Sequence, residues 1–445
     1  MYIIKRLIDM SSEMFLKRHL GPNEGEIKKM LNKVGVESLS QLLKETIPET
    51  IRLKNPIDLP DGISEYEFTK HINSLGKKNK LYKTYIGLGY HQTITPAVIQ
   101  RNILENPGWY TAYTPYQAEI AQGRLEALFN FQTIICDLTG MELSNASLLD
   151  ESTAAAEAMT MLYGSRSKEQ KTNQAINFLV DENILPQTLS LLKTRANPLG
   201  IKIILKDPET FEFNESFFGA IFQYPGKKGQ IPNLKNWIQK AKKNEVSTVV
   251  AADIMSLVLL ESPGEFGAEV VVERLKGWDT LRIWGTHAAF FATSAKYKRN
   301  IPGRIIGQTV DLDDNPALRM ALQTREQHIK RDRATSNICT AQVLLAVMAG
   351  MYGVYHGPKG LKNIAEKIHQ KANKLNKNIK ALGFKQKNSY FFDTLQFCAN
   401  ASEIKNIAEE KEINFYYPDK NTICISLNET TNNEDILEIT SVFEI

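Results

Sequence analysis

Residues 247–273 read "STVVAADIMSLVLLESPGEFGAEVVVE", and this stretch decides the fold class. The apolar run 247–252 ends at an aspartate, and a second apolar run follows at 268–272. Apolar runs of this length that are rich in valine are typical of buried strands. Further runs of the same kind lie at 176–181, 201–205, 219–225 and 288–293.

The segments between these strands have the pattern of amphipathic helices, at 183–197 and 233–245. Strands that alternate with helices predict a mostly parallel sheet with helices on both faces. A long helix is expected before them, from Glu119 to its stop at Gly140. Its apolar face is expected to consist of Ile120, Leu125, Leu128, Ile135 and Leu138.

The sequence predicts that the chain consists of three regions. Residues 1–80 indicate a helical N-terminal arm and linker, with Asn23 as a helix cap, and residues 81–340 form the large α/β domain. Residues 341–445 predict a small C-terminal α/β domain. An apolar helix at 340–355 leads into it. A Lys-rich helix is expected at 361–382, and strands are expected at 391–397, 413–418 and 422–427.

Composition restricts the class of protein. The 445 residues carry a net charge of +4, which does not suggest a nucleic-acid binder with a concentrated basic face. No apolar run approaches membrane-spanning length, and the N-terminus lacks the apolar region of a signal peptide. The four cysteines are too far apart for a metal-ligand pattern or a disulfide framework: Cys136, Cys339, Cys398 and Cys424. We therefore expect a cytoplasmic protein.

A large sheet followed by a small α/β domain favours the aminotransferase-like fold of pyridoxal-phosphate (PLP) enzymes, fold type I. Such an enzyme needs an acid at a strand end and a lysine for the Schiff base. Asp253 ends a predicted strand and Lys276 follows 23 residues later. The alternative interpretation is a strand-end carboxylate and a solvated loop lysine, and spacing alone leaves both open.

The helix N-terminus that would hold the phosphate of PLP argues against PLP binding in this chain. Asp150 and Glu151 precede the predicted helix "STAAAEAMTML" at 152–162. Carboxylates at this position satisfy the free N–H groups of the first helical turn, and they would repel a phosphate dianion.

Two other segments are candidate binding surfaces. The run 106–124, "NPGWYTAYTPYQAEIAQGR", concentrates aromatic side chains between prolines, which indicates either a binding surface or a cover for the core. The run 325–337, "REQHIKRDRATSN", could meet phosphate or nucleic acid; a charged helix face or a site for an acidic partner is the interpretation we favour. Three histidines have no partner visible in the sequence: His91, His287 and His356.

Long stretches of the chain resemble the P-protein of the glycine cleavage system, the decarboxylating glycine dehydrogenase, and specifically the N-terminal half of that family. The stretches that carry the resemblance are 15–31, 105–140, 145–159, "IPGRIIG" at 301–307, 317–342 and 391–397. The resemblance implies that PLP and its lysine belong to the other half, so that Lys276 is disfavoured and no catalytic or metal-binding residue is expected here.

The family's activity gives further expectations. The two halves, as a heterodimer or heterotetramer, bind glycine, release CO2 and pass the aminomethyl group to the lipoyl arm of the H-protein. Residues expected to wall the active site or contact a partner are Tyr113, Thr114, Tyr116, Gln117, Arg325 and His328. Two alternatives stay open: a self-sufficient PLP enzyme that uses Asp253 and Lys276, and an inactive fragment of a fused gene.

One segment departs from the family. Residues 273–287 read "ERLKGWDTLRIWGTH". The corresponding stretch in members of the family is similar to "GSSQRFGVPMGYGGPH". A one-base shift of the reading frame would turn the codons of Trp278 and Trp284 into glycine codons. We therefore interpret this stretch as the product of a displaced reading frame, a hypothesis that the nucleotide sequence can test.

Overall fold

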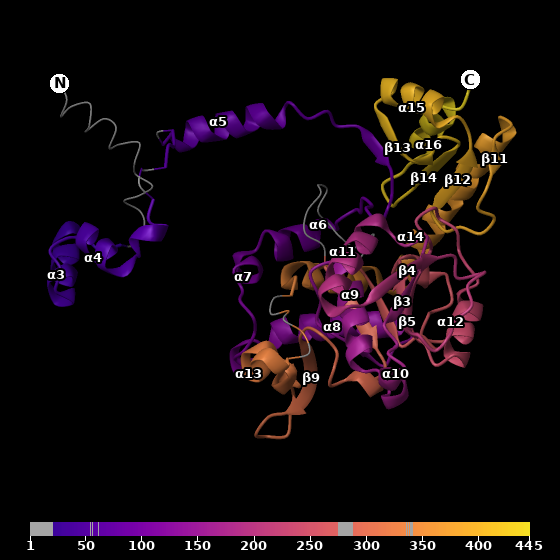
Figure 1. Cartoon of the computed structure of the whole chain (residues 1–445). Coiled ribbons are helices and arrows are strands. Elements are labelled where there is room, and N and C mark those ends of the chain that lie inside the picture. Colours follow the sequence, from indigo (N-terminus) through magenta and orange to yellow (C-terminus); the bar gives the residue numbers. More distant parts are fainter. Residues whose placement is uncertain are drawn as a thin grey trace. The chain divides into compact units, whose positions relative to one another are not determined.

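The computed structural model describes residues 21–53, 55, 57–60, 62–274, 288–334, 336, 338 and 341–445. The chain divides into two compact units, Met1–Leu81 and Tyr82–Ile445 (Figure 1). The predictions for Lys276, Trp278, Trp284, His287 and Cys339 lie outside the described residues.

The first unit is helical where it is described. Its helices are α3 (Glu24–Val34), α4 (Leu39–Thr46) and α5 (Glu65–Gly76). Asn23 caps α3 in a reciprocal pair with Glu26, and Gly35 ends the helix at a positive φ of 88°. The side chain of Asn23 accepts a hydrogen bond from the backbone of Glu26, as the sequence predicted for this cap. None of these three helices buries a residue.

A seven-stranded sheet organises the second unit. Its strands lie in the order β2-β8-β7-β6-β5-β3-β4, and the five from β7 to β4 are parallel. The bounds are β2 (Leu143–Ser144), β3 (Asn177–Asp181), β4 (Lys202–Lys206), β5 (Phe217–Tyr224), β6 (Ser247–Ala252), β7 (Val270–Arg274) and β8 (Ala289–Thr293). The prediction of a mostly parallel sheet from the six apolar runs is confirmed.

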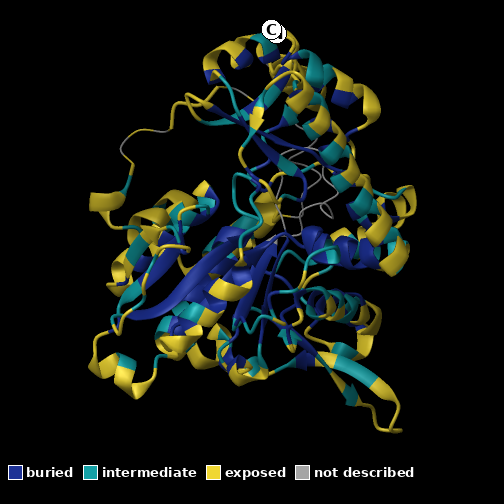
Figure 2. Ribbon diagram, turned by 90° about the vertical axis from the view of Figure 1, so that its right-hand side faces the viewer, coloured by how far each residue is buried: buried dark blue, intermediate teal, exposed yellow. Residues whose placement is uncertain are grey.

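Helices cover both faces of this sheet, and Figure 2 shows the buried strands between more exposed helices. One face packs against α9 (Glu151–Gly164) and α11 (Pro186–Ala196), and the other against α8 (Gln122–Thr139), α12 (Leu234–Lys243) and α14 (Val343–Ala381). Short helices lie at α6 (Ala97–Ile99), α7 (Pro107–Tyr110), α10 (Lys168–Thr172) and α13 (Gln327–Lys330), and a hairpin is formed by β9 (Ile305–Val310) and β10 (Pro316–Ala321). In the described part of the chain, no helix combines the length and the apolar content that a membrane crossing requires.

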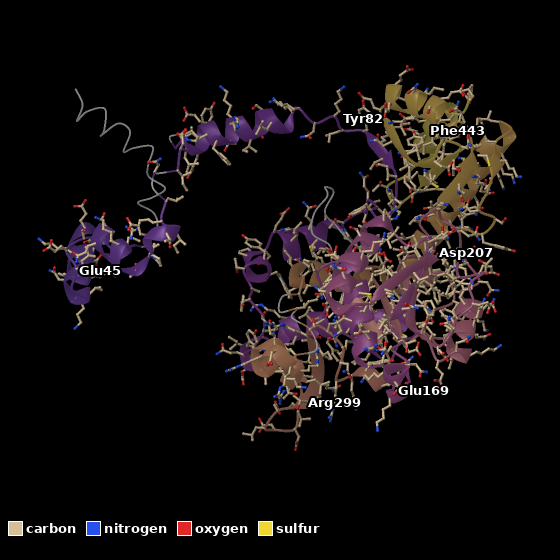
Figure 3. All side chains as sticks on the ribbon, viewed as in Figure 1. Glu45, Tyr82, Glu169, Asp207, Arg299 and Phe443 are labelled. Carbon is tan, nitrogen blue, oxygen red and sulfur yellow. The ribbon has the colours of Figure 1, made fainter. Side chains whose placement is uncertain are left out.

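A smaller sheet forms from the C-terminal strands and one strand from the start of the unit. The strand order is β1-β13-β14-β12-β11. The elements are β1 (Lys83–Tyr85), β11 (Lys385–Gln386), β12 (Thr394–Cys398), α15 (Ala401–Glu410), β13 (Ile413–Asp419), β14 (Thr422–Ser426) and α16 (Asn433–Ser441). Phe443, labelled in Figure 3, packs in the core of this sheet. Residues 83–85, which the predicted boundaries give to the large domain, therefore belong to the small sheet.

The start of α8 differs from the expectation. Ile120 is 79% exposed and is not part of the core, because it lies in a short 3-10 turn at Ala118–Ile120 that precedes α8. The expected apolar helix and Lys-rich helix are both present: they share the label α14 and are separated by a kink at Gly357, whose φ is 59°. Pro358 follows the kink, and His356 precedes it with its ring centroid 4.3 Å from that of Tyr352.

A second segment of the backbone approaches the end of α8 closely. Gly140 ends the helix at a φ of 69°, as predicted, and the N–H of Gly264 donates to the carbonyl of Thr139 at 2.9 Å. A Cβ on Gly264 would lie 2.2 Å from the carbonyl oxygen of Gly140. Only glycine fits this crossing without moving one of the two chains.

We expect Gly264→Ala to destabilise the protein by about 1–3 kcal/mol or more, because backbone atoms cannot yield to the new methyl group as a side chain can. Chemical denaturation measures the change in the free energy of unfolding. Gly164→Ala is the matched control, since a Cβ there meets no atom within 4 Å at the end of α9. Equal stability of the two variants would contradict the packing at Gly264.

Candidate functional site

The carboxyl ends of the parallel strands are where ligands bind in open α/β sheets. Asp253 directly follows β6 and is buried, and its carboxylate accepts a hydrogen bond from the backbone of Met255 at 3.1 Å. His91 Nε2 lies 3.8 Å from Asp393 Oδ2, and both residues line small cavities beside Asp253. The structure thus supplies a partner for His91 that the sequence did not reveal.

The N-terminus of α9 also lies against this sheet. Asp150 is its N-cap and accepts a hydrogen bond from the backbone N–H of Thr153 at 2.7 Å. Glu151 is buried and accepts from the hydroxyl of Thr188 on α11 at 2.9 Å. Ser152 lies 3.2 Å from the same hydroxyl. The first turn of α9 is therefore held by two carboxylates and a side-chain network.

This arrangement does not fit the phosphate of PLP. A phosphate at a helix N-terminus needs free N–H groups and an uncompensated dipole. Here the carboxylate of Asp150 already accepts from that turn, and the buried carboxyl group of Glu151 adds a second acidic group. A dianion in the same place would face like charges in a poorly solvated environment. The sequence prediction that acidic residues occupy this helix start agrees with the geometry.

A second cluster has Arg304 at its centre, from the "IPGRIIG" loop before β9. Arg304 Nη2 donates to the hydroxyl of Tyr116 at 3.0 Å, and its guanidinium carbon lies 4.9 Å from the Tyr116 ring centroid. Arg304 Nη1 is 3.6 Å from Glu326 Oε2, and His328 Nδ1 is also 3.6 Å from that oxygen. The rings of Tyr116 and His328 meet edge to face with centroids 6.4 Å apart. The aromatic run and the basic run therefore converge on one buried arginine.

Arg325 has a different role from its neighbours in the sequence. It is only 6% exposed and donates to the carbonyls of Ile301 and Gly303. Burial lowers the pKa of its guanidinium to about 10, and nearby Glu326 opposes that shift. Gly303 has a φ of 77°, and a Cβ there would lie 2.8 Å from the side chain of Asn145. Arg325 thus holds the loop that presents Arg304.

The outer side of this cluster is a surface that we call the Tyr–His face: Tyr113, Tyr116 and His328 with the exposed α13 residues Ile329 and Lys330 and the adjacent Arg331. Tyr113 is 78% exposed and Tyr116 is 46% exposed, and their ring centroids are 6.3 Å apart. Of the other candidate residues in this run, Thr114 is half-buried and Gln117 is exposed.

The sequence prediction named Tyr113, Tyr116 and His328 but missed Arg304 and Glu326, which join them. The available signal was the "IPGRIIG" stretch, which contributes the arginine from a loop well separated from both runs. Contacts between segments this distant in the chain cannot be deduced from spacing alone.

Comparison with known proteins places the chain in a family. The family model described as "Glycine cleavage system P-protein" matches residues 17–443. The glycine dehydrogenase (decarboxylating) of Christiangramia forsetii is 60% identical over 435 residues, which are 98% of this chain and 46% of that protein. The enzyme of the same name from Synechocystis is 52% identical, over 97% of this chain and 44% of the relative. The chain spans about half the length of these curated relatives and corresponds to their N-terminal half.

Solved structures agree with this relation. A crystal structure of a glycine decarboxylase (P-protein) of the glycine cleavage system, in inhibitor-bound form, matches with a TM-score of 0.84 and 29% identity, over 96% of this chain and 99% of that one. Glutamate decarboxylase from Lactobacillus brevis, at 11% identity and a TM-score of 0.63, shares the fold alone. The fold is PLP fold type I, the aminotransferase-like class expected from the strand pattern, and the chain belongs to the glycine cleavage system P-protein family.

Proposed function

We propose that this chain is the half of a P-protein that works together with a separate, PLP-bearing half and is not catalytic by itself. The pair would bind glycine, release CO2 and transfer the aminomethyl group to the lipoyl arm of the H-protein. In this proposal PLP supplies the electron sink for decarboxylation from the partner, and this chain supports the partner and walls its active site.

The observation that carries the proposal is the filled N-terminus of α9. Asp150 and Glu151 take the place that a phosphate needs, while the family and the fold are those of PLP enzymes. A chain that keeps the fold but places acidic groups at this helix start is best explained as one half of a composite enzyme. The coverage of about half of each relative supports the same division.

The Tyr–His face is the proposed contact with the partner half or the H-protein. Exposed aromatic rings next to positive charges fit a partner that offers apolar pockets and carboxylates. Arg304 and Arg325 are positioning residues in this proposal, because both are buried behind the face. A cytoplasmic location, a heterodimeric or heterotetrameric assembly, and the boundary between large and small domains near residue 340 stay predictions.

A PLP-binding experiment tests which of the two halves carries the cofactor. We expect the purified chain, mixed with PLP and then dialysed, to retain no visible absorbance from the cofactor, because the acidic helix start repels its phosphate. Co-expression with a P-protein half that carries the Schiff-base lysine should give a complex that retains it. Stoichiometric PLP on this chain alone would instead support the alternative that uses Asp253 and Lys276.

Charge reversal tests the Tyr–His face. We expect the double variant Lys330→Glu, Arg331→Glu to weaken association with the partner half, or to raise the KM for H-protein, by about tenfold, since two attractive contacts become repulsive. Lys242→Glu, Lys243→Glu on α12 is the matched control, because both lysines are exposed on a different helix. If both double variants behave like the parent protein, α13 does not contact either partner.

A further inference from the structure

Helix α14 connects the two cores of the second unit and is kinked between them. Its residues up to Ile368 pack in the core of the large sheet, and those from Ala372 onward pack in the core of the small sheet. The kink is at Gly357, with a φ of 59° and a ψ of 179°, a conformation that glycine adopts far more readily than other residues. Pro358 follows and has no N–H with which to continue the first helical segment.

One glutamate in the turn after β14 joins the two segments of α14. Oε2 of Glu429 accepts a hydrogen bond from the hydroxyl of Tyr352 at 3.1 Å, before the kink. The backbone carbonyl of Glu429 accepts from Lys371 Nζ at 3.3 Å, after the kink. The same Oε2 accepts from the backbone N–H of Ile94 at 2.9 Å, in the loop that follows β1. We call Glu429, Tyr352, Lys371 and Ile94 the Glu429 clamp.

His356 is the last residue before the kink and lies against this clamp. Its ring centroid is 4.3 Å from that of Tyr352 and 5.0 Å from that of Tyr355. Its Nε2 is buried and has no hydrogen-bond partner in the described structure. The neutral ring can leave a lone pair on this nitrogen, but the protonated ring carries a hydrogen on both nitrogens. The hydrogen on Nε2 would then be a buried donor without an acceptor, which is costly.

The titratable groups around His356 do not offer it a negative partner. Tyr352 and Tyr355 lie on its own helix, and the clamp residues Glu429 and Lys371 lie behind Tyr352. Glu429 already accepts two hydrogen bonds with Oε2, and Lys371 adds a positive charge. Burial lowers the pKa of the His356 imidazole, and within the described part of the chain no carboxylate offsets that effect.

We propose that the kink of α14 is a pH-sensitive switch, in which protonation of His356 breaks its contact with Tyr352 and changes the angle between the two helical segments. The neutral ring fits against Tyr352 and keeps the kinked form. The protonated ring turns Nε2 towards water, which moves the ring away from Tyr352 and loosens the Glu429 clamp. Because Ile94 belongs to the clamp, the loop after β1 responds together with the helix. The switch does not depend on which half of the enzyme carries PLP.

The direction of the pH effect follows from the lowered pKa of His356. The kinked form binds the proton more weakly than a form with an exposed ring. Its stability is therefore fully present above the usual histidine pKa of 6.5 and is lost as the pH falls below that value. Glu429 acts in the opposite direction, because burial raises the pKa of its carboxyl group and protonation then favours the kinked form. Loosening of the kink in acid is therefore specific to His356.

Hydrogen exchange of the whole chain tests the switch, measured by mass spectrometry at pH values of about 7.5 and about 5.5 on either side of the usual histidine pKa. After correction for the intrinsic exchange rate, we expect the amides of residues 350–360 to exchange up to about tenfold faster at the lower pH, since one pKa unit between the two forms changes their ratio by that factor. His356→Phe keeps a ring against Tyr352 but cannot be protonated, and should abolish this increase. His71→Phe is the matched control, because His71 is exposed on α5 in the first unit.

Tyr352→Phe isolates the clamp from the proton. Loss of the hydroxyl should speed exchange around the kink and around Ile94 at both pH values, while the additional increase in acid remains. The proposal is overturned if the parent protein shows the same corrected exchange at both pH values, or if His356→Phe keeps the increase. An increase spread evenly over the whole second unit would show general acid destabilisation and would also overturn it. None of these results depends on the glycine cleavage reaction.

Discussion

The first turn of a helix has a limited set of free N–H groups, and in α9 the carboxylate of Asp150 accepts a hydrogen bond from one of them. Asp150 accepts from the turn directly, and Glu151 is held below it by Thr188 of α11. A carboxylate at such a turn satisfies its N–H groups and the positive end of the helix dipole, and it repels an anion placed there. At the same edge of the sheet, Asp253 is buried at the end of β6.

Arg304 has a comparable role for the surface of the second unit. Its guanidinium contacts a tyrosine from one segment and a glutamate from another, and Arg325 fixes the backbone from which it projects. A planar, permanently charged group with several donors is suited to such a junction, because it can serve a ring face, a hydroxyl and a carboxylate together. The aromatic and basic runs become one surface through this residue.

Two regions at the same edge of the sheet differ in the polar side chains that line them. Beside β6 and α9, buried acids are engaged by backbone N–H groups and hydroxyls, and the cavities there are small. Beside β3 and β4, Asp181, Asp207 and Glu209 line a cavity of about 660 Å³. Positions close together at one edge therefore differ in ligand chemistry, because side-chain packing and not strand order decides which polar groups remain accessible.

The sequence by itself predicted the sheet, because short valine-rich apolar runs that alternate with amphipathic helices favour buried strands, and it predicted the acidic start of α9 from Asp150 and Glu151. It also gave the end of α8 at Gly140, a local signal that needs no tertiary contact. It misplaced Ile120 and did not reveal the partner of His91, the role of Arg304 or the acidic cavity. Only the tertiary structure decided these, because each depends on side chains that are distant along the chain and that folding alone brings within a few ångströms.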